Sequence, residues 1–261
     1  MGEATRQVRL ADLRRYLAEA EGFGQKAAVL PFGLPAIDDA LPWQGLPLAS
    51  LHEIENAGTA GEDGAASLFL AGILARLTLL ASSGGRPVLW CLQRTDLHAP
   101  GLALAGLAAE RLVLLRAPNE RDLLWAMEEG LRSRALAAVV GEVDALSMPA
   151  SRRLQLAAES TGVTGFVLHR SAIEAATSAA VTRWRIAALP SALVAGEPGI
   201  GRPRWRVELL RCRGGMPKTW EVEACDAQSG GTTGHVAVSA GLADRPALQQ
   251  IRTRGQISAA G

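Results

Sequence analysis

Residues 51–81 read LHEIENAGTAGEDGAASLFLAGILARLTLLA. The apolar run Leu51–Ile54 predicts a buried strand, and the apolar residues from about Ala65 to Ala81 predict a long helix. A loop with three glycines joins them: Gly58, Gly61 and Gly64. A strand, a glycine-rich loop and a helix in this order are typical of a P-loop, which binds phosphate at the start of a nucleotide-binding domain. The stretch therefore predicts a P-loop-like architecture.

The side chains that would bind a phosphate are missing from this loop. A P-loop needs a lysine for the terminal phosphates, followed by a serine or threonine for Mg²⁺. These two positions are Ala65 and Ala66 if the frame is set on Gly64, or Glu62 and Asp63 if it is set on Gly61. The two lysines of the chain, at positions 26 and 218, are far from the loop. The sequence therefore predicts a degenerate P-loop without a nucleotide cofactor.

The acid that such sites need for Mg²⁺ is also missing. ATPases of this kind hold Mg²⁺ with an acid at the end of a buried strand, the Walker B position. Here the predicted strand Leu136–Val140 is followed by Gly141. Glu142 comes one residue late, and Asp144 lies beyond the strand end. We interpret both acids as residues of a solvated loop, and we expect no enzymatic activity.

Composition indicates an ordinary soluble protein. The chain has 261 residues, 48% of them apolar, and a formal net charge of +1, which does not by itself suggest a nucleic-acid partner. Three cysteines without a C-x-x-C spacing favour buried thiols in a reducing compartment. The four histidines lack metal-ligand spacing, so no metal site is expected. The first residues show no signal peptide, and no apolar run is long enough for a membrane span, which predicts a cytoplasmic protein.

Strands and helices alternate along the middle of the chain, which predicts an α/β fold with a mostly parallel sheet between helices. Past Ser171 the pattern becomes antiparallel. The predicted strands cover residues 88–92, 111–115, 136–140, 165–168, 184–189, 204–212 and 221–224, and the helices after the glycine-rich loop cover residues 100–109, 120–133 and 149–160. Trp90, Trp184 and Trp205 are expected in the core, and Trp43, in a turn, is the tryptophan expected to be exposed.

The chain divides into three parts. Residues 1–28 predict an amphipathic helix and a linker, with Leu10, Leu13 and Leu17 on one face. Residues 29–227 form the predicted core, and residues 228–261 read as a flexible tail.

Two basic features leave alternatives open. Arg204 and Arg206 share one face of a predicted strand, where they could bind single-stranded DNA or be the solvated reverse of a core stripe with Trp205. The second alternative is favoured. His169 and Arg170 end a predicted strand, where open α/β sheets bind ligands, but a capped strand end is the favoured interpretation.

The segments before the glycine-rich loop resemble the RecA recombinase core immediately ahead of its P-loop. These segments are Phe32–Leu41, Gly45–Pro47 and Leu51–Ile54. More specifically, the chain is similar to the ImuA family, RecA-related proteins of bacterial damage-induced mutagenesis. The further matching segments, within about residues 31–226, are Pro87–Cys91, Ala99–Leu102, Leu124–Ser133, Ser151–Ala157 and Gly201–Gly215.

The resemblance implies a RecA-like, P-loop NTPase-type fold and an accessory role in DNA repair. Its partners would be ImuB, a homologue of Y-family polymerases, and the error-prone polymerase ImuC, in translesion synthesis during the SOS response. RecA's ATP-site residues cannot be carried over to Ala65, Ala66 and Gly141. By the same resemblance, Leu10, Leu13 and Leu17 would contact ImuB, RecA or another copy of the chain.

Two other functions stay open at this point. One is an ATP-dependent RecA-type recombinase, and the other is an interaction protein similar to SOS cell-division inhibitors. Weak binding of single-stranded DNA through Arg204 and Arg206 could accompany an accessory role.

Overall fold

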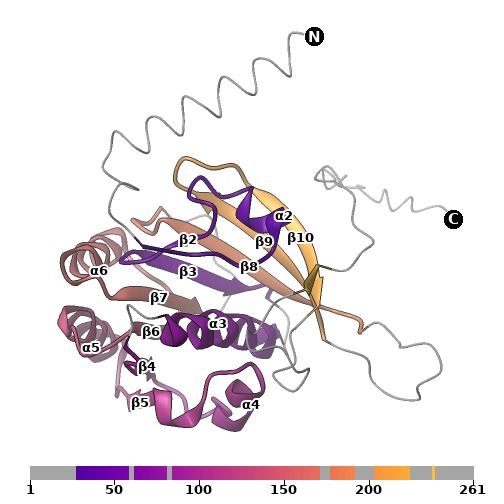
Figure 1. The fold of residues 1–261 in the computed structure, drawn as a ribbon. Coiled ribbons are helices and arrows are strands. Elements are labelled where there is room, and N and C mark those ends of the chain that lie inside the picture. Colours follow the sequence, from indigo (N-terminus) through magenta and orange to yellow (C-terminus); the bar gives the residue numbers. More distant parts are fainter. Residues whose placement is uncertain are drawn as a thin grey trace, which may run out of the picture.

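A single mixed sheet of nine strands organises the protein (Figure 1). The computed structural model describes residues 28–58, 62–80, 84–170, 177–191, 203–223 and 237–238. The predicted N-terminal helix with Leu10, Leu13 and Leu17, most of the predicted tail, and Gly61 lie outside these residues. Within the predicted tail, the two-residue strand β11 (Ala237–Val238) pairs with β10 (Lys218–Glu223).

The strand order is β11-β10-β9-β8-β3-β7-β6-β4-β5. The strands from β8 to β5 in this order run parallel, and β9, β10 and β11 run antiparallel to their neighbours, so the predicted α/β fold with antiparallel strands after the parallel set is confirmed. The antiparallel pattern predicted past Ser171 begins one strand later than expected, because β8 pairs parallel with β3. The bounds are β3 (Leu51–Asn56), β4 (Val88–Leu92), β5 (Leu112–Arg116), β6 (Ala138–Val143), β7 (Thr164–His169), β8 (Thr182–Leu189) and β9 (Arg204–Cys212). A separate two-stranded sheet joins β1 (Val29–Leu30) to β2 (Leu46–Pro47).

Helices cover both faces of the sheet, as the apolar strands require. On one face α3 (Glu62–Leu79) packs against β3 and β8, with Phe69 and Leu74 in a cluster that includes Ile54 and Trp184. On the other face α5 (Glu120–Arg132) and α6 (Met148–Thr161) share a second cluster with Leu51 and Val167. The short elements are α2 (Pro35–Asp38), α4 (Ala99–Leu104) and the 3-10 turn η2 (Ala109–Arg111).

Most predicted elements lie within a few residues of their observed bounds, but two predictions are wrong. The strand predicted to end at Val140 continues as β6 to Val143, so Gly141 and Glu142 are strand residues. Trp43 is partly buried against the core, whereas Trp125 on α5 is 65% exposed. The three tryptophans predicted in the core, Trp90, Trp184 and Trp205, are buried as expected.

None of the helices in the described ranges is long and apolar enough to cross a membrane.

Candidate functional site

The predicted strand and helix are present as β3 and α3, and Gly58 is described in the turn that follows β3. Gly58 has φ 95°, a backbone conformation that favours glycine. The Asn56 side chain fixes this turn, because its Oδ1 accepts a hydrogen bond from the Gly58 amide at 3.0 Å. Its Nδ2 donates to the Arg170 carbonyl, also at 3.0 Å. The turn is therefore attached to the end of the neighbouring strand β7.

The two alanines at the phosphate-binding positions face the protein interior. Ala65 and Ala66 are 4% and 1% exposed, and both belong to the cluster on the α3 face of the sheet. Gly64, just before them, is exposed, and an added Cβ there would meet open space. Methyl groups packed in the core offer neither a charge nor a hydroxyl, so these two side chains give a phosphate nothing to bind.

Gly141, at the predicted Walker B position, packs directly against helix α5. A Cβ added to Gly141 would lie 2.0 Å from Sδ of Met127, which is far too close. An acid at this position would therefore have to displace Met127, which is itself fully buried. Any side chain at position 141 would point to the face of the sheet opposite to α3, where Met127 already fills the space.

Glu142 is buried, which corrects its interpretation as part of a solvated loop. It is 3% exposed, and it lies on the same face of β6 as Val140. Its Oε1 accepts a hydrogen bond from Nε1 of Trp90 at 2.8 Å, and its Oε2 accepts one from Nη1 of Arg170 at 2.9 Å. These partners lie far away in the sequence. Asp144 is exposed in the loop after β6, as expected.

Arg170 joins the ends of three neighbouring strands through ion pairs. Besides Glu142 of β6, its guanidinium contacts Asp96, which follows β4, and Arg170 itself follows β7. We call these four residues, Trp90, Asp96, Glu142 and Arg170, the carboxyl-edge clasp. Carboxyl ends of parallel strands are where open α/β sheets bind ligands. Here the protein's own side chains occupy that edge, which agrees with the interpretation of Arg170 as a structural residue.

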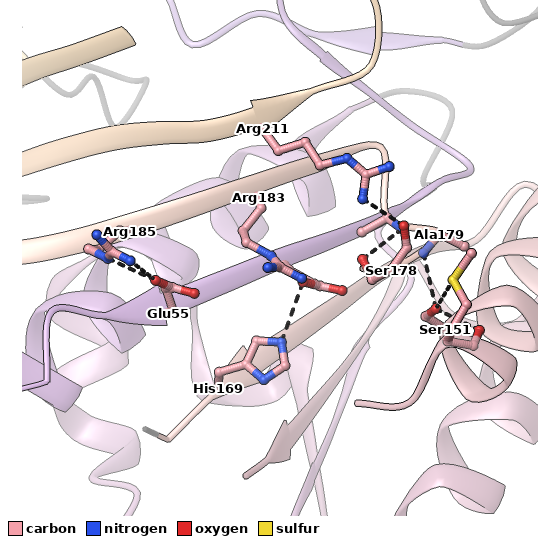
Figure 2. Close-up of polar contacts among 11 residues, drawn as sticks. Glu55, Ser151, His169, Ser178, Ala179, Arg183, Arg185 and Arg211 are labelled. Carbon is pink, nitrogen blue, oxygen red and sulfur yellow. Dashed lines mark hydrogen bonds and ion pairs between the residues drawn. The ribbon is translucent and has the colours of Figure 1, made fainter. Parts of the chain in front are cut away.

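A second polar cluster lies on the α6 side of the sheet (Figure 2). Glu53 of β3 is fully buried and accepts a hydrogen bond from Nε of Arg183 at 2.6 Å, while its Oε2 lies 3.6 Å from Nε2 of His169. Burial alone would raise the pKa of Glu53, but the polar side chains of His169 and Ser178 and the charge of Arg183 outweigh it and lower that pKa. Glu53 and Arg183 therefore form a buried ion pair between β3 and β8.

The same pattern repeats two residues further along both strands. Glu55 accepts a hydrogen bond from Nε of Arg185 at 2.8 Å, and Arg185 also pairs with Glu208 of β9 at 3.5 Å. Sequence reasoning missed this cluster. The available signal was the equal spacing of two acids and of two arginines. Glu53 lies in the buried strand predicted at 51–54 and Glu55 just after it, while Arg185 lies in the strand predicted at 184–189 and Arg183 just before it.

Arg204 and Arg206 lie on the more exposed face of β9, and the opposite face of this strand packs into the core. Trp205, Val207 and Leu209 are buried, while Arg206 is exposed. Arg204 pairs with Glu221 of β10 at 3.0 Å. The charge of Arg204 is thus already balanced on this face.

Cys91 and Cys212 are free, buried thiols, as predicted for this chain's cysteines. Burial raises the pKa of each to about 12, which keeps both protonated and unreactive at neutral pH. Among the described residues, no three His, Cys, Asp or Glu side chains are grouped so that they could hold a metal ion.

Fold and site together define an α/β protein in which Ala65 and Ala66, near the start of α3, are buried, and in which the protein's own side chains join the carboxyl ends of β4, β6 and β7. Protein ImuA of Caulobacter vibrioides, in strains NA1000 and CB 15, is 42% identical to this chain over 212 residues, which is 77% of this chain and 86% of the relative. The chain belongs to the ImuA family, as the resemblance predicted.

Two further comparisons add nothing to this assignment. No protein-family model matches the chain. The crystal structure of SulA from Pseudomonas aeruginosa aligns with a TM-score of 0.38 and 26% identity, over 44% of this chain and 96% of that chain. A TM-score this low carries no argument about function.

Proposed function

We propose that this protein is a non-catalytic, RecA-like accessory factor of SOS-induced, error-prone translesion DNA synthesis, working with ImuB and the ImuC polymerase. Membership of the ImuA family supports the place in damage-induced mutagenesis. The observation that carries the non-catalytic role is the closed carboxyl edge, where a nucleotide-binding protein would keep an open, cationic site.

The clasp opposes phosphate binding on energetic grounds. Arg170 follows β7 at this edge, and it already contacts two carboxylates. Moving it to a phosphate would leave Glu142, whose side chain is 2% exposed, as a buried charge without its cation. Breaking a buried ion pair in this way costs about 3–5 kcal/mol. Nearby carboxylates would also repel a phosphate.

The turn after β3 keeps a structural role in this proposal. Gly58 turns the chain at the end of the central strand, and Asn56 ties this turn to the end of β7. The arrangement of β3, turn and α3, with β3 between its parallel partners β7 and β8, supports a RecA-like ancestry for the fold. In this view the loop persists because the fold needs it.

A fluorescent-ATP titration of the full chain tests the non-catalytic role. We expect no saturable binding up to millimolar nucleotide, because the loop lacks lysine, hydroxyl and Walker B acid together. RecA in the same buffer is the positive control. Saturable binding, with or without hydrolysis, would contradict our proposal and favour the ATP-dependent alternative.

Co-purification from damage-treated cells tests the assignment of partners. We expect ImuB to be recovered with the tagged protein. Recovery of a cell-division protein in place of ImuB would favour the inhibitor-like alternative. A chain without residues 229–261 in the same experiment shows whether the tail contributes to binding.

We also propose that Leu10, Leu13 and Leu17 form part of the partner-binding surface. Replacing all three by Asp should abolish the recovery of ImuB, since charged residues cannot be buried cheaply in an apolar contact. Ala at Arg9, Asp12 and Arg15, which occupy other faces of the same predicted helix, is the matched control and should leave recovery unchanged. Equal recovery with both triple variants would remove these leucines from the surface.

A further inference from the structure

Helix α3 is apolar on all of its sides, unlike the other long helices. From Gly64 to its end at Leu79, Arg76 is its one charged residue. By contrast, α5 turns Arg121 and Arg132 to the solvent. A helix that is apolar all round is normally covered by protein on every side. Figure 1 shows α3 on one face of the sheet with α4 beside it, so the sheet and α4 cover only part of its surface.

The side of α3 that faces away from the sheet carries Gly64, Leu68, Gly72 and Leu79, which we call the outer ridge. Their spacing of four and seven residues places them on one side of the helix. Leu79 is 69% exposed, Gly64 is exposed, and Leu68 and Gly72 are partly exposed. A Cβ added to Gly64 or Gly72 would meet no atom of the described residues within 4 Å. The two glycines are therefore low points at which the side chains of another helix can enter.

The described chain begins beside α3. The guanidinium of Arg76 donates a hydrogen bond to the carbonyl of Pro31, and residue 28 lies only three positions before Pro31. Fully extended, residues 22–28 reach roughly 25 Å. The 18 residues of α3 span about 27 Å. The segment that precedes this linker, residues 4–21, can therefore lie along the outer ridge.

We propose that residues 4–21 dock as a helix on the outer ridge of the same chain, with Leu10, Leu13 and Leu17 over Gly72 and its neighbours. This segment is as long as α3, and its one apolar side is what the uncharged ridge lacks. The contact does not depend on the function proposed above. Because the same leucines belong to the partner surface proposed there, a partner has to displace the segment, and the docked state restrains partner binding.

Hydrogen exchange of the isolated full chain, followed by mass spectrometry, tests this contact without any partner or nucleotide. An unsupported helix of this length is marginal in water, so docking should slow exchange of the amides in residues 10–20 by at least about tenfold relative to a free peptide of residues 1–27. Gly72→Lys and Leu79→Lys place a charge on the ridge, and each should remove most of that protection. Replacing Leu10, Leu13 and Leu17 by Asp should do the same.

Leu156→Lys is the matched control, because Leu156 is 58% exposed on α6, across the sheet from α3, and it should change these exchange rates by less than about twofold. Circular dichroism and a cooperative melt confirm that each variant is folded. A segment that exchanges like the free peptide overturns the inference. So does protection that both ridge variants leave intact, which would place the segment elsewhere, or protection lost on tenfold dilution, which would make a second copy the occupant.

Discussion

Gly141 and Gly64 are two glycines of the degenerate site with opposite surroundings. Gly141→Ala should lower the free energy of unfolding by about 1–3 kcal/mol, because its Cβ overlaps Met127 Sδ, 2.0 Å away. Gly64→Ala, in the first turn of α3 with open space around it, should raise that free energy by about 0.5–1 kcal/mol. Urea denaturation of both variants measures the difference. Equal effects would mean that Met127 moves aside without cost.

His52 should make stability depend on pH. The ring is fully buried, with Nε2 at 2.8 Å from the Pro47 carbonyl and Nδ1 at 2.8 Å from the Thr182 hydroxyl. Burial lowers its pKa from 6.5 to about 4, although the hydrogen bond to Pro47 opposes this shift. Between these two pKa values, His52 of the unfolded chain binds a proton and His52 of the folded chain does not. The free energy of unfolding should fall as the pH drops from about 6.5 towards 4, by about 3 kcal/mol in total.

Urea denaturation between pH 7.5 and 5, with His52→Gln as the comparison, isolates this effect. The variant should be less stable at pH 7.5 but should lose less stability on acidification. Glu53, whose pKa is lowered from 4.5, contributes a loss only at pH values below that figure. Parallel pH profiles for the two proteins would assign the effect to another group.

At the scale of elements, the clasp should hold the ends of β4, β6 and β7 together. Arg170→Met should destabilise the protein by about 3 kcal/mol or more, because it removes one partner of a buried ion pair in which the Glu142 side chain is 2% exposed. Asp96→Asn should cost less than about 1 kcal/mol, since the Asp96 side chain is 50% exposed. Denaturant unfolding compares the two. Similar costs would show that Glu142 accepts a proton or a water in place of Arg170.

The charged face of β9 and β10 should contribute to the sheet more than to DNA binding. Arg204 is paired with Glu221, and Arg206 lies opposite Glu221 in the ladder, so the acids of β10 balance these arginines. We expect Arg204→Ala with Arg206→Ala to change affinity for single-stranded DNA by less than about twofold in low salt. Fluorescence anisotropy measures this. A large, salt-sensitive loss would assign the face to phosphate contacts.

At the scale of the whole molecule, the sheet makes the two apolar clusters one cooperative structure. Leu74 of α3 and Leu123 of α5 are both fully buried, on opposite faces of the sheet. Each replaced by Ala should cost about 2–5 kcal/mol and move the same single transition, whether followed by tryptophan fluorescence or by circular dichroism. Two separated transitions would show that the faces unfold independently.

Local patterns predicted the elements well because each is a property of a short segment. The strand β4 and the helices α5 and α6 follow from apolar periodicity and from turn residues next to them. The partners of Glu142 and Glu53 could not be predicted in this way, because Trp90, Arg170 and Arg183 reach them only in the folded sheet. Trp43 was misjudged for the same reason, since packing against the core overrides its place in a turn.

The central position of β3 has a consequence for the order in which the chain leaves the ribosome. The Thr182 hydroxyl that contacts His52 lies 130 residues later in the sequence, and the pairing of Leu51 with Gly165 is almost as distant. At a synthesis rate of about 5–20 residues per second, β3 is made roughly ten seconds before the strands that pair with it. During that interval both of its edges and the apolar helix α3 stay uncovered in the nascent chain, so this protein should depend on a chaperone during synthesis.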